Sequence, residues 1–438
     1  METFENFITA NADADTARLL LSNREWPVNE DPVLGTIDSK DLAINTIETR
    51  KKLMKKIPSW TSNTGLVYPT RLCGEQCSSE KTASYKAALA ERIISGRNGS
   101  KGKIADLTGG LGVDSHAFAS VAKEVFYNEI DPALAAAASH NFHLLGADNI
   151  LVNSSEVAPG KISSILGDFN PDIIFMDPAR RDSAGKKVFL LEDCSPDVLK
   201  LIPELFEESR NILLKLSPMA DLTMVVERLN KASEACSGHP AGQGRCVREV
   251  HVTAWGGECK ELLVWMDREY VGRHSTVCCE DGNTMRFEPG DESTPFCGMD
   301  STYSRLLFEP GKSLSKAAML NEMSHRLKLA GLARFTHLFV PEEVLSEDEA
   351  EKVAENLARF GKVFRIIETV PFSKAALKDI AGRYPHSEVS ARNIPMSSDE
   401  LRKKLKVTSG DDAHIFGVRI ELPSGSGNHL IVCKPFGK

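Results

Sequence analysis

Several features that define whole classes of protein are missing from this 438-residue chain. It has no run of 18 or more apolar residues, so we expect no transmembrane helix. Its ten cysteines show neither CxxC spacing nor a second Cys or His pair at zinc-ribbon spacing, which argues against a metal site. Internal repeats and low-complexity tracts are also missing. These absences leave an ordinary globular protein, and its length allows two or three domains.

Basic residues are outnumbered by acidic residues, so the formal net charge is −8 at pH 7. That balance argues against a surface covered by nucleic acid, although it allows a local basic patch. Two stretches are locally basic. Arg50–Lys56 has five basic residues in seven, and residues 368–438 hold eleven Lys and Arg against eight Asp and Glu. For the first stretch, a solvated helix face is the simpler interpretation.

The first residues of the chain are acidic and lack the basic start of a secretory signal. Scattered cysteines in a chain of this kind are typical of free thiols in a reducing compartment. We therefore expect a cytoplasmic protein.

The most informative stretch is Lys103–Asp114, with the sequence KIADLTGGLGVD. It reads as a short buried strand, then a turn with Gly109, Gly110 and Gly112, and then the start of a helix. This order is typical of the nucleotide-binding corner of a doubly wound α/β sheet. Glycine allows a sharp turn and lets a ligand lie against the backbone. The alternative is an ordinary strand-to-helix turn.

Acidic residues near this turn indicate which ligand it would bind. Asp106 comes just before the glycines, where a carboxylate would repel a pyrophosphate but suit the ammonium of S-adenosylmethionine (SAM). The next expected strand, Glu124–Ile130, is followed by Asp131 and contains Glu129 near its end. An acid at this place accepts hydrogen bonds from ribose hydroxyls. Because NAD enzymes share that acid, Asp106 is what favours SAM over a nicotinamide cofactor.

Strand and helix patterns alternate through residues 101–267, which predicts a parallel sheet with right-handed crossovers. A hairpin with its turn at Gly256–Gly257 then replaces a further strand–helix unit. A Rossmann-like sheet closed by an antiparallel hairpin differs from the standard dinucleotide fold and resembles class I SAM-dependent methyltransferases. The expected parallel strands are Lys103–Leu107, Glu124–Ile130, Asn149–Asn153, Asp172–Met176 and Asn211–Leu216.

The regions on either side of this α/β domain have other patterns. Residues 1–100 read as a mostly helical N-terminal region. After residue 267, the polar and turn-rich stretch Cys278–Thr294 suggests a boundary. We expect residues 268–367 to form a small α+β region of ferredoxin-like type, and residues 368–438 to form a second small α+β unit that ends in a hairpin.

The carboxyl end of the fourth strand holds the best candidate for catalysis. Ligands of open parallel sheets bind beyond the carboxyl ends of the strands. Here an apolar run ends in Asp177-Pro178, and the proline prevents the strand from continuing. Asp177 would then face the crevice and orient a nucleophile or accept its proton. Arg180 and Arg181 would contact a phosphate of a large substrate, with solvent-exposed arginines as an equal alternative.

Longer motifs resemble known families. DLTGGLGVD, NEIDP and DPARR resemble the first, second and fourth motifs of class I methyltransferases. The segments EQCSSEKTASYK, GGECKELLVW, LFEPGKSLSKA and VPFSKAALKDI resemble a family of SAM-dependent methyltransferases with a C-terminal THUMP-like domain. The resemblance implies that Asp106 and the three glycines line the methionine end of SAM and that Glu129 binds ribose. It also implies that Asn153 and Ser154 lie near adenine and that Asp177 faces the methyl group.

The resemblance further implies a substrate, because THUMP domains bind RNA, such as rRNA or tRNA. Enzymes that methylate an exocyclic amine often carry an aromatic residue after this Asp-Pro motif, where it stacks on the target base. No aromatic residue follows the Asp-Pro pair of DPAR, which disfavours that reaction here. DPAR also resembles RNA uracil-C5 methyltransferases, but the fifth strand ends in Lys215–Pro218 without their cysteine nucleophile. Cys194 is more easily explained as structural. We therefore predict an RNA methyltransferase. The alternatives are a methyltransferase of a small molecule or protein, and an RNA-binding protein that no longer catalyses.

Overall fold

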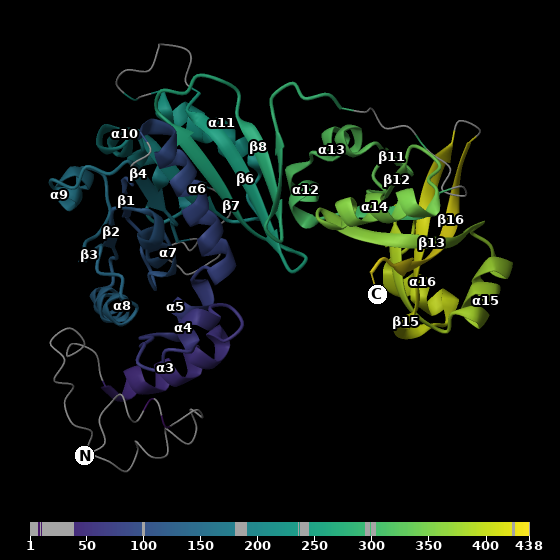
Figure 1. The fold of residues 1–438 in the computed structure, drawn as a ribbon, viewed down its shortest axis with the longest axis horizontal. Helices are drawn as coiled ribbons and strands as arrows, with labels where there is room; N and C mark the ends of the chain where they lie inside the picture. The colour runs from purple at the N-terminus through teal and green to yellow at the C-terminus, as the bar shows by residue number, and fades with distance from the viewer. Residues whose placement is uncertain are drawn as a thin grey trace. The chain divides into compact units, whose positions relative to one another are not determined.

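The computed structural model of the chain divides into two compact units (Figure 1). The first contains the chain up to Val250 together with Leu262–Arg273, and the second contains His251–Glu261 and the chain from His274 onward. The structure describes residues 8, 10, 39–98, 101–179, 191–234, 236, 245–293, 298, 304–422 and 425–437.

A doubly wound sheet forms the centre of the first unit. Seven neighbouring strands follow the order β3-β2-β1-β4-β5-β7-β6. Strands β1 to β5 pair in parallel, whereas β7 is antiparallel to β5. This confirms the predicted Rossmann-like sheet closed by an antiparallel hairpin. The strands are β1 (Lys103–Asp106), β2 (Glu124–Asn128), β3 (Ile150–Asn153), β4 (Ile173–Met176), β5 (Asn211–Leu216), β6 (Val247–Trp255) and β7 (Glu258–Asp267).

Helices connect these strands, and their starts follow ordinary capping chemistry. Asp131 caps α8 by accepting hydrogen bonds from two backbone N–H groups of its first turn, and Pro132 occupies the first helical position. Helix α10 starts at Val198 because the side chain of Asp197 caps it by accepting a hydrogen bond from the Leu199 N–H. The helices are α6 (Glu80–Asn98), α7 (Val113–Val121), α8 (Pro132–Leu144), α9 (Ile162–Leu166), α10 (Val198–Glu208) and α11 (Leu222–Ser233).

Apolar side chains of α6 and α7 cover one face of this sheet. Phe118 of α7 packs edge-on against Phe175 of β4, with ring centroids 5.1 Å apart, and both side chains are buried. Ile104 and Leu213 of neighbouring strands lie in the same cluster. This core fixes β1 and β4 side by side, so the polar residues that follow each strand emerge at the same edge of the sheet.

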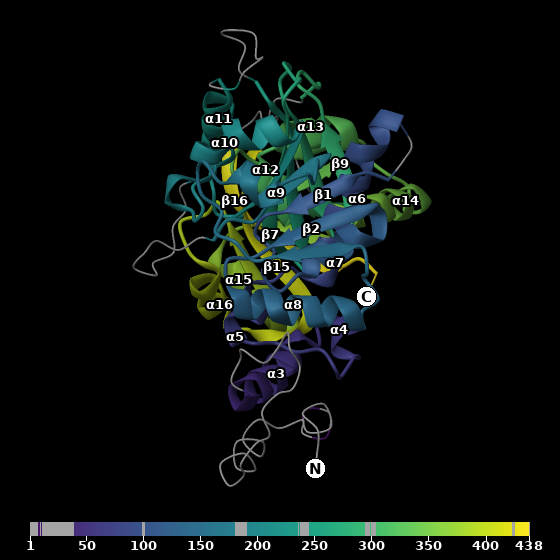
Figure 2. The ribbon, with the colours of Figure 1, turned by 90° about the vertical axis from the view of Figure 1, so that its left-hand side faces the viewer.

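The described N-terminal residues are helical and pack on the glycine turn. Figures 1 and 2 show α3 (Ser39–Leu53), α4 (Pro58–Thr61) and α5 (Arg71–Gln76) together at the purple end of the chain. Trp60 and Tyr68 of this region share a buried cluster with residues of the turn and α7. Part of the basic stretch that was expected to be solvated is structural: Lys56 donates hydrogen bonds to two carbonyls of α5, at 3.1 and 2.8 Å.

The second unit contains a hairpin that the sequence did not indicate. Cys278–Thr294 was expected to be a turn-rich boundary, but it includes most of a hairpin formed by β8 (Ser275–Glu280) and β9 (Asn283–Phe287). The turn between them is Asp281-Gly282, and both residues have positive φ angles, +47° and +91°. An Asp-Gly pair between strands is a strong hairpin signal. Cys278 and Cys279 are adjacent in β8, and both side chains are buried.

A seven-stranded sheet forms the rest of the second unit, in the order β11-β12-β10-β13-β16-β15-β14. Its strands come from residues 306–371 and 386–435 alike. Most neighbours are antiparallel, and β14 pairs with β15 in parallel. The elements are β10 (Leu306–Pro310), α12 (Lys312–Ala317), α13 (Leu320–Leu327), β11 (Leu329–Gly331), β12 (Phe339–Pro341), α14 (Glu347–Ala358), β13 (Gly361–Pro371), α15 (Lys374–Arg383), β14 (His386–Arg392), α16 (Ser398–Leu405), β15 (Thr408–Leu422) and β16 (Gly425–Pro435).

The described residues contain neither a membrane-spanning helix nor a cluster of metal ligands. Among their helices, none is both long and apolar enough to cross a membrane. Within the same residues, no three His, Cys, Asp or Glu side chains gather in a way that could hold a metal ion.

Candidate active site

The glycine turn between β1 and α7 is packed on one side and open on the other. A Cβ atom on Gly109 would lie 2.1 Å from the ring of Tyr127, and one on Gly112 would lie 2.4 Å from the ring of Phe142. A Cβ on Gly110 would meet no heavy atom within 4 Å. Gly109 and Gly112 therefore make room for aromatic rings of the protein itself. Gly110 is the glycine against which a ligand could lie.

Gly112 combines a left-handed backbone, with φ of +86°, and a missing Cβ that would collide with Phe142. We expect Gly112→Ala to lower the free energy of unfolding by about 2–4 kcal/mol, since it adds backbone strain to overpacking. Urea unfolding monitored by fluorescence measures this loss. Gly146→Ala is the matched control, because its φ is +69° but its Cβ would meet nothing within 4 Å. If the two variants lose the same free energy of unfolding, the ring of Phe142 can move aside without an energetic cost.

Asp106 lies at the end of β1 and is buried, with an exposed fraction of 1%. Its Oδ2 accepts a hydrogen bond from Ser115 Oγ at 2.6 Å, and its Oδ1 accepts one from the Thr108 N–H at 3.1 Å. These two donors hold the carboxylate inside the turn. It braces the first turn of α7 against β1. Contact between Asp106 and a cofactor stays a prediction.

Burial raises the pKa of Asp106 to about 7, from an ordinary value of 3.8, although the Ser115 hydrogen bond opposes this rise. The folded chain therefore keeps a proton between about pH 4 and 7 that the unfolded chain has lost, so stability falls as pH rises through this window. Asp106→Asn removes the buried charge. We expect it to raise the free energy of unfolding by about 1–3 kcal/mol at about pH 8 and to change it little near pH 4.

Urea unfolding of both proteins at the two pH values measures this effect. The Ser115 hydroxyl can rotate to accept a hydrogen bond from the new amide, so the variant keeps a partner at this position. Asp131→Asn is the control, because Asp131 is exposed and asparagine caps a helix equally well. If Asp106→Asn lowered stability at both pH values, the hydrogen bonds to the carboxylate would outweigh the burial of its charge.

Glu129 connects the glycine turn to the end of β2. Its Oε2 accepts a hydrogen bond from the Gly110 N–H at 2.9 Å, and its Oε1 accepts one from the Asp131 N–H at 3.0 Å. The Glu129 N–H donates to the carbonyl of Asn153 at 3.3 Å. These contacts bring Glu129, Gly110 and Asn153 together, as the sequence predicted. Asp131 is instead engaged as the cap of α8, and Ser154 is exposed.

Asn128 connects several backbone segments at the same edge of the sheet, and the sequence analysis did not identify this residue. This buried side chain donates hydrogen bonds to the carbonyls of Leu107 at 3.2 Å and Ser155 at 3.0 Å. Its Oδ1 accepts a hydrogen bond from Asn153 Nδ2 at 2.7 Å. The residue precedes Glu129 in NEIDP, so its place in that motif was the available signal.

Asp177 emerges from β4 beside Lys215 of β5. The Asp177 N–H donates to Thr108 Oγ1 at 2.6 Å, and the carboxylate forms an ion pair with the Lys215 ammonium. The exposed fractions of the two side chains are 33% for Asp177 and 12% for Lys215. The pair follows from strand register, because Met176 of β4 lies opposite Leu214 of β5. Arg180 and Arg181, the predicted substrate contacts, lie outside the described residues.

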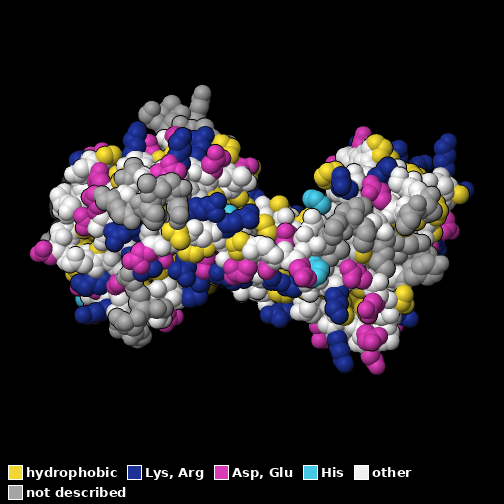
Figure 3. All heavy atoms as spheres, turned by 90° about the horizontal axis from the view of Figure 1, so that it is seen from above, with side chains coloured by type: hydrophobic (Ala, Val, Ile, Leu, Met, Phe, Trp, Pro, Cys, Tyr) yellow, Lys and Arg dark blue, Asp and Glu magenta, His cyan; other side chains and the backbone are white. Residues whose placement is uncertain are grey.

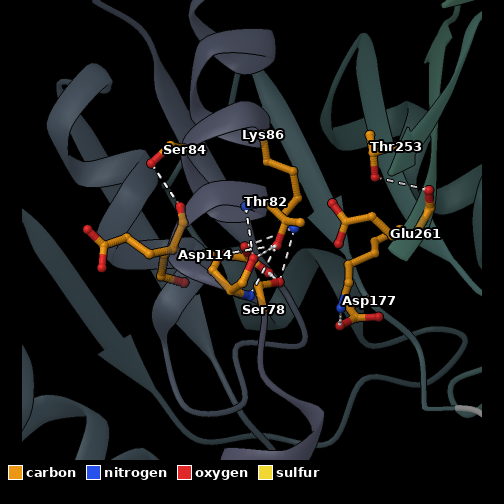
Figure 4. Close-up of polar contacts among 12 residues, drawn as sticks. Ser78, Thr82, Ser84, Lys86, Asp114, Asp177, Thr253 and Glu261 are labelled. Atoms are coloured by element: carbon orange, nitrogen blue, oxygen red, sulfur yellow. Dashed lines mark hydrogen bonds and ion pairs between the residues drawn. The ribbon is translucent and has the colours of Figure 1, made fainter. Parts of the chain in front are cut away.

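A buried ion pair lies next to the start of α7. Figure 4 shows Ser78, Lys86 and Asp114 pointing toward one another. The Lys86 ammonium is fully buried, 3.2 Å from Asp114 Oδ1 and 3.0 Å from Ser78 Oγ. Ser78 Oγ donates a hydrogen bond to Asp114 Oδ2 at 2.7 Å. Asp114 Oδ1 accepts no hydrogen bond from the described residues, so the charge of Lys86 is what stabilises it.

Two residues of this network, Ser78 and Lys86, belong to the segment EQCSSEKTASYK, whose small hydroxyl residues are typical of a helix cap. The cap is present, since the Thr82 N–H donates to Ser79 Oγ at 3.2 Å just before α6. Ser78, the preceding residue, points the other way and binds Asp114 of α7. The segment therefore begins a helix and also anchors the glycine turn.

Comparisons with known proteins agree with this geometry. Residues 361–435 match the family model described as THUMP domain-like. The crystal structure of a "putative methyltransferase from Porphyromonas gingivalis W83" has a TM-score of 0.77 and 28% sequence identity, and the match covers 99% of this chain and 98% of that chain. A search of curated protein sequences finds no match to this chain.

Further solved structures are similar over part of the chain only. A SAM-dependent methyltransferase from Agrobacterium tumefaciens has 16% identity and a TM-score of 0.30, covering 44% of this chain and 63% of that chain. The tRNA m1G37 methyltransferase of M. jannaschii has 14% identity and a TM-score of 0.28, covering 44% and 50%. Scores this low add nothing to the assignment of this chain. The chain thus has the Rossmann-like sheet of a class I methyltransferase, shares its fold over almost its whole length with the P. gingivalis protein, and matches the THUMP domain-like family at residues 361–435.

Proposed function

We propose that this protein is a cytoplasmic SAM-dependent methyltransferase that acts on RNA. One observation carries the proposal: the open side of the glycine turn, the carboxylate of Glu129 and the Asp177–Lys215 pair all lie at the carboxyl ends of neighbouring parallel strands. Ligands of doubly wound sheets bind at this edge. The nine described cysteines are free, which supports a reducing compartment.

The residues at the turn fit SAM by their chemistry. Gly110 offers a backbone surface without a side chain, and Glu129 is held by two N–H groups next to it. A carboxylate has about four lone-pair sites, so Glu129 can also accept hydrogen bonds from ribose hydroxyls. Asn153 and Ser154 continue this edge toward the place proposed for adenine. SAM, when bound, supplies an activated methyl group on a positively charged sulfur.

Asp177 and Lys215 are the groups proposed to handle the substrate. Asp177 is held by Thr108 and Lys215, so its carboxylate has a defined position from which to orient a nucleophile or accept its proton. The Lys215 ammonium keeps this carboxylate in place and adds a positive charge that suits the phosphates of RNA. Methyl transfer from a sulfonium needs mainly alignment of the reacting atoms, so a rigid carboxylate is sufficient help.

The RNA substrate is supported by the THUMP-like match and by the basic balance of the last stretch of the chain. On the face shown in Figure 3, lysines and arginines are interspersed with acids rather than gathered in one field. This pattern agrees with the net charge of −8 and favours a few local contacts over a broad coating of nucleic acid. Arg180 and Arg181 remain proposed phosphate contacts.

Two measurements on the full chain test this function. Isothermal titration with SAM should show one binding site per chain. Incubation with radiolabelled SAM and bulk cellular RNA should place the label in RNA, and mass spectrometry of the nucleosides then identifies the methylated base. If the label appears only in a small-molecule or protein fraction, the substrate belongs to that fraction and is not RNA. If the chain does not bind SAM, the proposed enzymatic activity is wrong, and the protein is a non-catalytic one with this fold.

A further inference from the structure

The tip of the β11–β12 hairpin, residues 332–338, presents an aromatic ring to solvent. Phe335 has an exposed fraction of 76%, the largest among the big apolar side chains of the described residues. Its φ angle is +66°, and that of His337 is +54°. Bulky residues rarely adopt this left-handed conformation. Such strain persists only where surrounding contacts impose it, and it concentrates at functional sites.

Contacts from the rest of the second unit impose this conformation. Asn393 Nδ2 donates a hydrogen bond to the carbonyl of Arg334 at 2.8 Å, and Thr336 Oγ1 donates one to the carbonyl of Arg419 at 3.2 Å. Asn393 itself has a φ of +57°. Asn393, on a different segment, thus holds a tip that itself contains two residues of positive φ. The ring of Phe335 is presented by a rigid support.

The neighbours of Phe335 are basic or polar. Arg334 and His337 are exposed, while Thr336 between them is buried. The tip contains no acidic residue, and in the described part of the chain no carboxylate forms an ion pair with Arg334. A protein-docking surface would need a contiguous apolar patch of a few hundred Å². A single ring between a guanidinium and an imidazole instead suits a base and its adjacent phosphate.

We propose that Phe335 is a stacking platform for a base of single-stranded RNA and that Arg334 binds a neighbouring phosphate. The proposal rests on the RNA substrate proposed above and adds a contact site to it. The tip precedes residues 361–435, so it lies outside the part of the chain that matches the THUMP-like model. Asn393 acts as a positioning residue, because it holds the carbonyl of Arg334.

Fluorescence anisotropy with a labelled oligouridine of about 12 nucleotides tests the site. An aromatic ring stacks on any base, so oligouridine is a suitable probe. Phe335→Ala removes the ring and should weaken binding by about tenfold or more. Phe335→Trp keeps an aromatic ring and should bind as tightly as the wild type or more tightly. Phe335→Leu keeps an apolar side chain but removes the ring, so it should bind as weakly as the alanine variant. Arg334→Gln should reduce the slope of log affinity against log salt by about one.

Val344 provides the matched control, because it is 75% exposed in the same unit but follows Glu342 and Glu343. Val344→Ala should leave RNA affinity unchanged. Wild-type affinity in Phe335→Ala or Phe335→Leu would overturn the stacking site, and continued labelling of RNA by the same variant would show that the proposed function stands. If the wild type binds no RNA and labels none, the RNA substrate and this site both fall, whereas SAM binding is judged separately by titration.

Discussion

Replacing Asp177 with asparagine is expected to lower the rate of methyl transfer by about 100- to 10,000-fold. The amide keeps the shape of the side chain, and the backbone N–H of residue 177 keeps its hydrogen bond to Thr108. The variant loses the negative charge that pairs with Lys215 and could receive a proton. Because Asp177 is proposed to act on the substrate, the affinity for SAM should stay within about threefold.

Single-turnover transfer of label from SAM to RNA measures the rate, and calorimetric titration measures the affinity. Asp168→Asn is the matched control, because it makes the same change of charge at an exposed residue before β4, at the opposite edge of the sheet. That variant should retain the wild-type rate. A wild-type rate in Asp177→Asn would mean that alignment alone accounts for catalysis and that Asp177 is not a catalytic residue. Weakened SAM binding with an unchanged rate would assign it to the cofactor site.

Removing the charge of Lys86 is expected to destabilise the first unit by about 3–5 kcal/mol. In Lys86→Met the buried carboxylate of Asp114 loses the ammonium 3.2 Å away and, among the residues that the structure describes, keeps the hydroxyl of Ser78 as its hydrogen-bond donor. A buried charge without a counter-charge is costly, and Asp114 lies in the first turn of α7, next to the glycine turn. We therefore expect weaker SAM binding to accompany the loss of stability.

Urea unfolding measures the loss, and a second substitution separates charge from packing. Lys86→Met with Asp114→Asn removes both charges and should recover more than half of the stability. Lys52→Met is the control, because Lys52 pairs with Glu75 where both side chains are about half exposed, at 51% and 56%. That change should cost about 0.5 kcal/mol or less. A double variant as unstable as Lys86→Met would mean that lost packing of the lysine stem, and not the stranded charge, causes the effect.

The sequence alone led to the α/β fold because the signals for it are local. Apolar runs, glycine turns and capping residues recur in a strand–helix order that few other folds produce. The hairpin at Gly256–Gly257 and the grouping of Glu129 with Gly110 follow from the same patterns. The β8–β9 hairpin was missed because Cys278 and Cys279 lie among polar residues, so the Asp-Gly turn was read as part of a loop.

The sequence thus determined the order of the strands and helices and which residues follow the ends of the strands, since both depend on neighbours along the chain. Only the tertiary structure decided what those residues face. The sequence placed Asp106 before the glycine turn, and only the structure showed that Ser115 and Thr108 hold its carboxylate inside. The partner of Asp177 is 38 residues away and that of Asp114 is 28 residues away in the other direction. Burial and charge pairing depend on packing between distant segments, and periodicity along the chain carries no information about them.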